Sequence, residues 1–347
     1  MHVGHCEDLH ARLGLDSEEK RREFNAEVKV GFLREMAALP QTIHTVILSS
    51  EYFHSRLRQE DELRGLRDLL AGAFDRIRIL VYLRRQDQVA VSHYSTGMRA
   101  GSTRREVLPE VGESDCYYNY DLLLAKWAAA FPEAEIKPRL FRRDEWPGGD
   151  LVHDFLDACG IEDRQGLRPP ERRNESISAP AQEFLRQMNL SFPAGDGRAD
   201  RHRDELVALV ASAFAGPGKL PSREAATRFY RVFEPSNERL RRQWLPQRQQ
   251  LFDDDFSMYP ALPAEDPSFA EVFAVAAVLV RKLRAEAAYR EGRIAQMKNR
   301  FDRAAEEYRA AVALDPTHAA ARHRLLRLAG GEGKRTGLQR LLLALRG

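Results

Sequence analysis

Short apolar runs rich in β-branched residues alternate with helix-like segments along the first half of this chain. The runs cover residues 44–48, 77–83 and 136–141. Because neighbouring parallel strands need a long crossover between them, usually a helix, this alternation predicts a parallel sheet. Pro138 cannot donate a ladder hydrogen bond and places the third run at an edge. The expected fold class is therefore α/β, with helices covering a parallel sheet.

The helix-like segments are recognised by apolar residues at helical spacing. In residues 1–40 the apolar positions recur every four residues after a polar start at 16–19, a typical helix N-terminus. Further helices are expected over residues 60–74, 84–98 (after a strand end and turn), 120–131, 152–159, 179–189 and 203–214.

The composition excludes several classes of protein. The 54 basic and 52 acidic residues leave a net charge of +2, which argues against a dedicated nucleic-acid binder. Cys6, Cys116 and Cys159 form neither a disulfide framework nor a metal-binding spacing. The longest apolar run, 272–280, is about half a membrane span, and no signal peptide is visible. A cytoplasmic protein without a membrane span is expected.

A Pro-rich stretch at residues 260–267 is the clearest linker. Beyond it the chain is rich in Ala, Arg and Glu and helical in pattern. The length, 347 residues, suggests about two domains. We therefore expect one domain over residues 1–265 and a helical tail over 266–347.

The segment from Val81 to Tyr94 carries the strongest functional signal. It places Arg84 at the end of a strand and Ser92 eight residues later on the next helix. A helix N-terminus offers free N–H groups and a positive dipole end, and an arginine fork adds two donors. Arg84 and Ser92 therefore predict an anion site; the alternative is a surface arginine and a mid-helix serine.

This Arg-x7-Ser spacing resembles the 3′-phosphate motif of sulfotransferases that use 3′-phosphoadenosine 5′-phosphosulfate. Residues 46–51, 127–131, 155–161 and 174–178 are also similar to the bacterial and glycan-directed branch of that family. The resemblance covers roughly residues 1–260. It implies a three-layer fold related to P-loop NTPases, and transfer of a sulfuryl group to a hydroxyl of a saccharide or small molecule.

The resemblance implies that Arg84 and Ser92 bind the 3′-phosphate and that Glu51 is the catalytic base, with no metal required. Sulfuryl transfer needs a proton acceptor beside the attacking hydroxyl. Glu51 follows a predicted strand end, where α/β sheets bind ligands; alternatively it is only a first-turn helix residue. His44, His54 and His93 are weaker candidates.

One part of the family pattern is missing: the first strand and its Gly-rich loop with a lysine, which would hold the 5′-phosphosulfate. Two glycine-containing stretches, 216–219 and 330–336, follow helices and do not replace it. The chain is expected to be a fragment, a mis-started reading frame or a degenerate member, with little or no sulfuryl transfer as it stands. Asp253–Asp255 is expected to be a solvated turn rather than a cation site.

Residues 285–318 resemble a tetratricopeptide repeat. Gly292, Ala304, Tyr308, Ala311 and Pro316 fall at the spacing of its small, aromatic and helix-ending positions. An ordinary αα-hairpin is the alternative.

Two other functions are considered for the whole chain. One is a catalytically incomplete interaction protein that binds a protein partner through its tail helices. The other is a P-loop kinase, against which the missing Walker loop and the pair Arg84 and Ser92 both argue.

Overall fold

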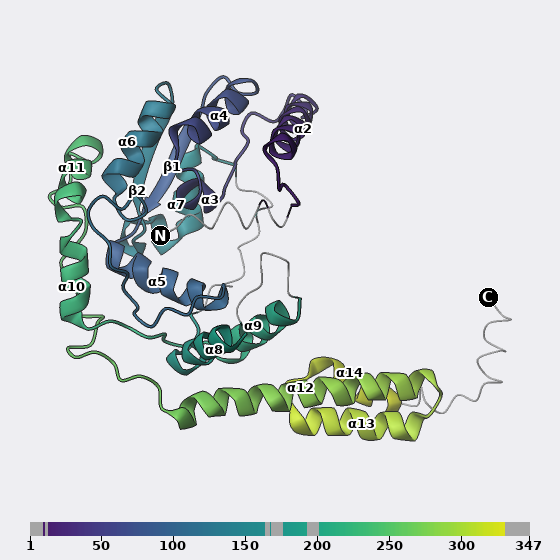
Figure 1. Ribbon diagram of the computed structural model, residues 1–347. Coiled ribbons are helices and arrows are strands. Elements are labelled where there is room, and N and C mark those ends of the chain that lie inside the picture. Colours follow the sequence, from purple (N-terminus) through teal and green to yellow (C-terminus); the bar gives the residue numbers. More distant parts are fainter. Residues whose placement is uncertain (1–9, 11–12, 164–166, 168–175, 193–200, 330–347) are drawn as a thin grey trace.

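The chain is mainly helical and contains a small parallel sheet of two strands, as Figure 1 shows. The computed structural model describes residues 10, 13–163, 167, 176–192 and 201–329. Within this part of the chain, the expected sheet is reduced to two strands, and helices dominate.

Strands β1 (Arg78–Leu83) and β2 (Glu135–Leu140) pair in parallel over their full length. The backbone amides of Glu135 and Phe141 both donate to β1 or its flank, so alternate residues of β2 face β1 and Pro138 faces away. The missing N–H of Pro138 therefore costs no ladder bond, which fits the edge position expected from the sequence.

The prediction of a first strand over residues 44–48 is wrong. The segment has no regular secondary structure, and among the described residues it joins no ladder. Ile47 and Leu48 are 45% and 43% exposed. A β-branched run becomes a strand only where a neighbouring strand pairs with it, and the described sheet contains no such neighbour.

The other expected elements form close to their predicted bounds. Helix α2 begins after Ser17, whose hydroxyl accepts the N–H of Lys20 at 3.2 Å. Helix α7 ends at Gly160, which adopts φ 74°. The helices are α2 (Glu18–Ala37), α3 (Tyr52–Ser55), α4 (Glu60–Ala71), α5 (Gln86–Arg99), α6 (Tyr120–Ala130), α7 (Leu151–Cys159), α8 (Ala179–Ser191), α9 (Arg201–Ala213), α10 (Arg223–Arg231), α11 (Glu234–Trp244), α12 (Phe269–Met297), α13 (Phe301–Leu314) and α14 (Ala319–Arg327), with two 3-10 turns at Arg143–Glu145 and Pro147–Gly149.

The main core surrounds the sheet. Leu83 and Leu140 end the two strands side by side and are almost fully buried. Leu124 and Trp127 of α6 and Leu63 of α4 complete this cluster. Helices α10 and α11 lie on one side of this body (Figure 1). The core thus fixes the carboxyl ends of both strands beside the start of α5.

The C-terminal helices form a closely packed hairpin, as the tetratricopeptide-like spacing predicts. Gly292 of α12 faces the Tyr308 ring of α13, and Tyr308 is fully buried. The Tyr308 hydroxyl donates to Gln296 Oε1 at 2.8 Å. Ala304 and Ala311 are also fully buried. The packing fits both a repeat and an ordinary αα-hairpin.

Helix α12 connects this hairpin to the rest of the protein. Val275 and Leu279, in its first half, are buried in a cluster with residues of α8 and α9. Its second half packs along α13 (Figure 1). In the linker before it, Asp266 pairs with Lys219 at 2.6 Å. The domain boundary near residue 265 stays a prediction. For the tail to be a separate domain, the contacts of α12 with α8 and α9 and the Asp266–Lys219 pair would have to break.

None of the helices described, including the 29-residue α12, is apolar enough over a sufficient length to cross a membrane.

The close approach of Gly292 and Tyr308 gives a testable prediction. A Cβ at Gly292 would lie 2.6 Å from Tyr308 Cε1, so Gly292→Ala should lower the free energy of unfolding by about 1–3 kcal/mol. Gly65→Ala on α4 is the control, because nothing lies within 4 Å of its Cβ position; it should stabilise by roughly 0.5–1 kcal/mol. Urea unfolding measures both, and equal effects would contradict the packing argument.

Candidate functional site

Arg84 lies directly after β1 and before α5, at the carboxyl end of the sheet. The Tyr120 hydroxyl donates to the Arg84 carbonyl at 2.7 Å and fixes the backbone there. The Arg84 side chain donates from Nε to Gln88 Oε1 at 3.0 Å, and its guanidinium lies 5.7 Å from the centre of the Phe141 ring. Ligands of open α/β sheets bind at this end of the strands.

Asp87 is the acid whose charge acts on Arg84, but its carboxylate is bound by Arg85 instead. No described carboxylate lies within ion-pairing distance of its half-buried guanidinium. Burial lowers the pKa of Arg84 from its ordinary value, although an arginine still keeps its charge near neutral pH. A partly desolvated arginine without an acidic partner is well suited to bind an anion.

Ser92 lies on α5 with its side chain exposed. Arg84 precedes α5, but its side chain reaches the helix through the hydrogen bond to Gln88, and Gln88 and Ser92 are four residues apart on one side of α5. The structure therefore places the two predicted anion-binding residues on the same side of α5, with Gln88 between them.

The next residue, Arg85, has a structural role. It is 3% exposed and donates from Nε and Nη2 to the two carboxylate oxygens of Asp87 at 2.8 and 3.0 Å. Its Nη1 donates to the carbonyls of Asp253 and Asp255 at 3.1 and 2.7 Å. The Phe256 ring covers the guanidinium at 4.0 Å. One buried arginine thus joins the start of α5 to the loop before the linker.

Asp87 is the acidic partner in this network. Its side chain is fully buried and also accepts the Tyr259 hydroxyl at 2.5 Å. Burial and the Asp87 carboxylate raise the pKa of Tyr259 strongly, so its proton stays in place. Arg85 balances the charge of Asp87, which would otherwise repel an anion bound near the α5 N-terminus.

In the Asp253–Asp255 run, Asp254 and Asp255 are exposed in an irregular segment, as expected of a solvated turn, whereas Asp253 is partly buried. The Asp253 carboxylate pairs with Arg85 at 3.0 Å and with Arg142 at 3.1 Å. The described part of the chain contains no cluster of three or more His, Cys, Asp or Glu side chains suited to a metal.

A second buried contact fixes the other side of α5. Gln86 and Asn237 exchange two amide hydrogen bonds at 2.7 and 3.1 Å, and both side chains are buried. Gln86 also donates to the Tyr118 carbonyl at 3.2 Å. Because α11 carries Asn237, this exchange ties α11 to the helix start.

Glu51, the predicted base, is exposed at the start of the short helix α3. Its carboxylate makes no capping bond, and the Ser50 hydroxyl accepts the N–H of Tyr52 at 3.1 Å instead. Burial raises the pKa of Tyr117, and the nearby Glu51 carboxylate adds to that increase. The charge of Glu51 therefore acts on the same aromatic residue onto which two of the predicted histidines stack.

Those histidines, His54 and His93, both stack onto the Tyr117 ring. The ring centres are 4.4 Å apart for His54 and 5.1 Å for His93. His54 Nε2 lies 2.9 Å from the Tyr117 carbonyl, so this nitrogen carries the proton and Nδ1 is the acceptor in the neutral ring. The stack links α3, which follows Glu51, to α5, which carries Ser92.

The remaining sequence candidates lie elsewhere. His44 is exposed in an irregular segment. The 216–219 stretch packs on α8: a Cβ at Gly218 would lie 2.4 Å from the Gln182 side chain, and Lys219 pairs with Asp266. The 330–336 stretch lies outside the described residues.

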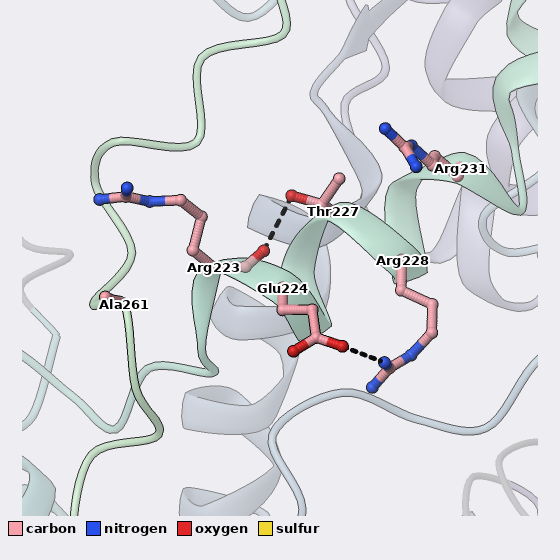
Figure 2. A pocket seen from close by; sticks show the side chains of 6 residues that line it. All are labelled: Arg223, Glu224, Thr227, Arg228, Arg231 and Ala261. Atoms are coloured by element: carbon pink, nitrogen blue, oxygen red, sulfur yellow. Dashed lines mark hydrogen bonds and ion pairs between the residues drawn. The ribbon is translucent and has the colours of Figure 1, made fainter.

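A pocket of about 610 Å³ opens on α10, away from these residues (Figure 2). Arg228 pairs with Glu224 at 3.1 Å, and Thr227 donates to the Arg223 carbonyl at 2.8 Å. Figure 2 shows Arg223, Arg228 and Arg231 extending in different directions, so they do not converge on one ligand position.

Sequence reasoning missed Arg85, Asp87, Tyr117 and Tyr259. Arg85 and Asp87 lie inside the motif that was singled out, and their opposite charges two residues apart were the available signal. No local pattern indicates that Tyr259, 172 positions from Asp87, completes the network.

The buried Arg85–Asp87 pair gives a second prediction. Asp87→Asn should lower the free energy of unfolding by roughly 3 kcal/mol, because the buried Arg85 loses its main counter-charge while Asp253 still pairs with it. The control is Asp68→Asn, whose pair with Arg67 is exposed and should contribute at most about 1 kcal/mol. Urea unfolding that finds equal effects would contradict a structural role for Asp87.

His54 predicts how stability depends on pH. Burial lowers its pKa below the ordinary 6.5, so below about pH 7 the unfolded chain binds a proton that the folded chain does not. The free energy of unfolding should fall as the pH drops through 6.5, and this contribution should level off below the folded-state pKa.

His54→Gln should remove this part of the pH dependence, whereas His153→Gln, at an exposed position, should leave it unchanged. Thermal unfolding between about pH 5 and about pH 8, a range that includes the ordinary histidine pKa, measures this pH dependence. An unchanged profile for His54→Gln would show that His54 does not titrate as argued.

Comparison with known proteins identifies no family. No protein-family model matches the chain, and no solved structure matches it. The chain is 27% identical over 188 residues to an uncharacterized protein of Archaeoglobus fulgidus. The match covers 52% of this chain and 50% of that protein, so the chain spans about half the length of the curated relative it matches. The function must therefore be argued from the site itself.

Proposed function

We propose that the β1–α5 junction binds the 3′-phosphate of a 3′-phosphoadenosine nucleotide and that the protein is a sulfotransferase with a hydroxyl-bearing acceptor, such as a saccharide. The observation that carries the proposal is Arg84, which is half-buried at the carboxyl end of a parallel strand and has no ion-pair partner among the residues that the structure describes. The finer fold assignment, a three-layer sulfotransferase fold related to P-loop NTPases, belongs to the same proposal.

The surroundings of Arg84 favour an anion over other ligands. Arg85 neutralises Asp87 beside the helix start, so Arg84 and the α5 N-terminus give this end of the sheet a local positive charge. The exposed Ser92 hydroxyl adds a neutral donor on the same side of α5. A phosphate group matches this set of an arginine fork, a helix start and a hydroxyl.

For the transfer itself, Glu51 is the proposed base. Its carboxylate is exposed, makes no capping bond and is close enough to Tyr117 to influence its pKa. It would accept the proton of the attacking hydroxyl as the sulfuryl group moves from the nucleotide. The stack of His54, Tyr117 and His93 would hold the α3 region against α5. The proposal assigns no residue of this chain to the 5′-phosphosulfate and requires no metal.

A second candidate function is partner binding through the C-terminal helices. The observation that favours it is an exposed apolar side of α12, which is described below.

Arg84→Ala and Ser92→Ala test the nucleotide site. An arginine–phosphate contact contributes about 1.5–3 kcal/mol, so Arg84→Ala should weaken binding of 3′-phosphoadenosine 5′-phosphate about tenfold or more. Ser92→Ala should weaken it less. Isothermal titration calorimetry measures both affinities, and circular dichroism checks the fold.

Arg64→Ala is the matched control, because Arg64 is an exposed arginine on α4. It should leave the affinity unchanged. If Arg84→Ala also leaves it unchanged, or if the wild-type chain does not bind the nucleotide, the proposed site is wrong.

A further inference from the structure

Helix α12 carries a second apolar pattern that its contacts with the described part of the chain do not use. Its residues repeat at alternating spacings of four and three over the whole helix, as at the a and d positions of a coiled coil. The nine positions are Phe269, Phe273, Ala276, Val280, Leu283, Ala287, Arg290, Ile294 and Met297, and we refer to them as the α12 seam.

The α12 seam faces solvent. Its six large apolar side chains are between 47% and 84% exposed, and the Phe269 and Phe273 rings stack 5.8 Å apart at the helix start. The contacts with α8 and with α13 use other positions, Leu279 and Gly292 among them. A continuous exposed apolar stripe of this length is typical of an interaction surface.

We propose that the α12 seam pairs with the α12 seam of a second copy of this chain, with the two helices antiparallel. A seam of this spacing needs another helix with the same spacing, and a second copy supplies one in every solution of the protein. The charges beside the seam select the direction of the partner helix.

A parallel, in-register pair would place like charges together. Glu286 would face Glu291 of the second copy, and Arg293 would face Lys298. Within the seam, Arg290 would face Arg290 of the second copy. Each of these contacts is repulsive.

An antiparallel pair removes these conflicts. With Val280 opposite Leu283 of the second copy, Phe269 lies opposite Ile294, and Phe273 lies opposite Arg290. The Arg290 side chain is 72% exposed and pairs through Nε with Glu286 of its own helix at 2.8 Å. In the antiparallel pair its guanidinium would lie over the Phe273 ring as a cation–π contact. On the exposed flank of the seam, the charge of Glu291 then lies opposite Ala270 of the second copy rather than opposite a like charge.

The oligomeric state of the full chain is the first test. Sedimentation velocity at micromolar concentrations should show a dimer, and Val280→Glu should weaken its association at least tenfold. Leu326→Glu is the control, because Leu326 is 71% exposed on α14, outside the seam. A monomeric wild-type chain, or equal weakening by both variants, overturns the proposal, whatever segment then covers the seam.

Cysteine cross-linking tests the direction. Phe269→Cys and Ile294→Cys are made separately in a chain whose three native cysteines are replaced by serine. The two positions lie about 37 Å apart along one helix, so only an antiparallel partner brings them together. Disulfide-linked dimers should form when the two variants are mixed and not from either alone. Cross-linking of a single variant, or none in the mixture, overturns the proposed arrangement.

Discussion

The buried pair of Arg85 and Asp87 is the interaction on which the rest of the site depends. Arg85 connects the start of α5 to the loop of Asp253, 168 positions away, and Asp87 connects it to Tyr259. A buried ion pair of this kind adds little net stability compared with apolar packing, but removing one partner leaves a charge that the interior cannot solvate. The pair therefore fixes the geometry of the junction, and it binds Asp87 to Arg85, so that Arg84 has no ion-pair partner among the described residues.

The parallel pairing of β1 and β2 determines where this junction opens. Tyr82 and Arg139 are opposite each other in the register, and both donate to the buried Asp154 of α7, Tyr82 at 2.6 Å. Burial opposes the ionisation of Asp154, but these two hydrogen bonds outweigh it and keep its pKa low. One face of the sheet is thus closed by α7, while the carboxyl ends of the strands remain beside α5. The packing that holds the sheet together thus leaves uncovered by α7 the end of the sheet at which we propose that a ligand binds.

Local sequence patterns predict where the helices and strands lie better than they predict which other parts of the chain these elements contact. Apolar runs located β1 and β2, and small residues at repeat spacing located the contact of Gly292 with Tyr308. The rule that an apolar run forms a strand fails at residues 44–48, because a strand also needs a neighbouring strand to pair with, which the local pattern does not reveal. Helix α2 forms as predicted, yet none of its residues is buried. The sequence indicates Arg84, Ser92 and Glu51 as site candidates, which stay predictions. It gives no sign of Tyr259, because the contact of Tyr259 with Asp87 joins distant parts of the chain.

Helix α12 shows why one sequence segment can satisfy two patterns. Small residues such as Ala285 and Gly292 allow close packing inside the chain and occupy one side of the helix. The α12 seam follows a spacing of three and four residues on another side, where the small residues of the repeat do not fall. The two surfaces can coexist because each covers only part of the circumference of the helix. Both can extend along α12 because it has 29 residues. Packing against α8 and α13 thus holds α12 rigid from within the chain, and a rigid helix loses less entropy when its exposed side pairs with another surface.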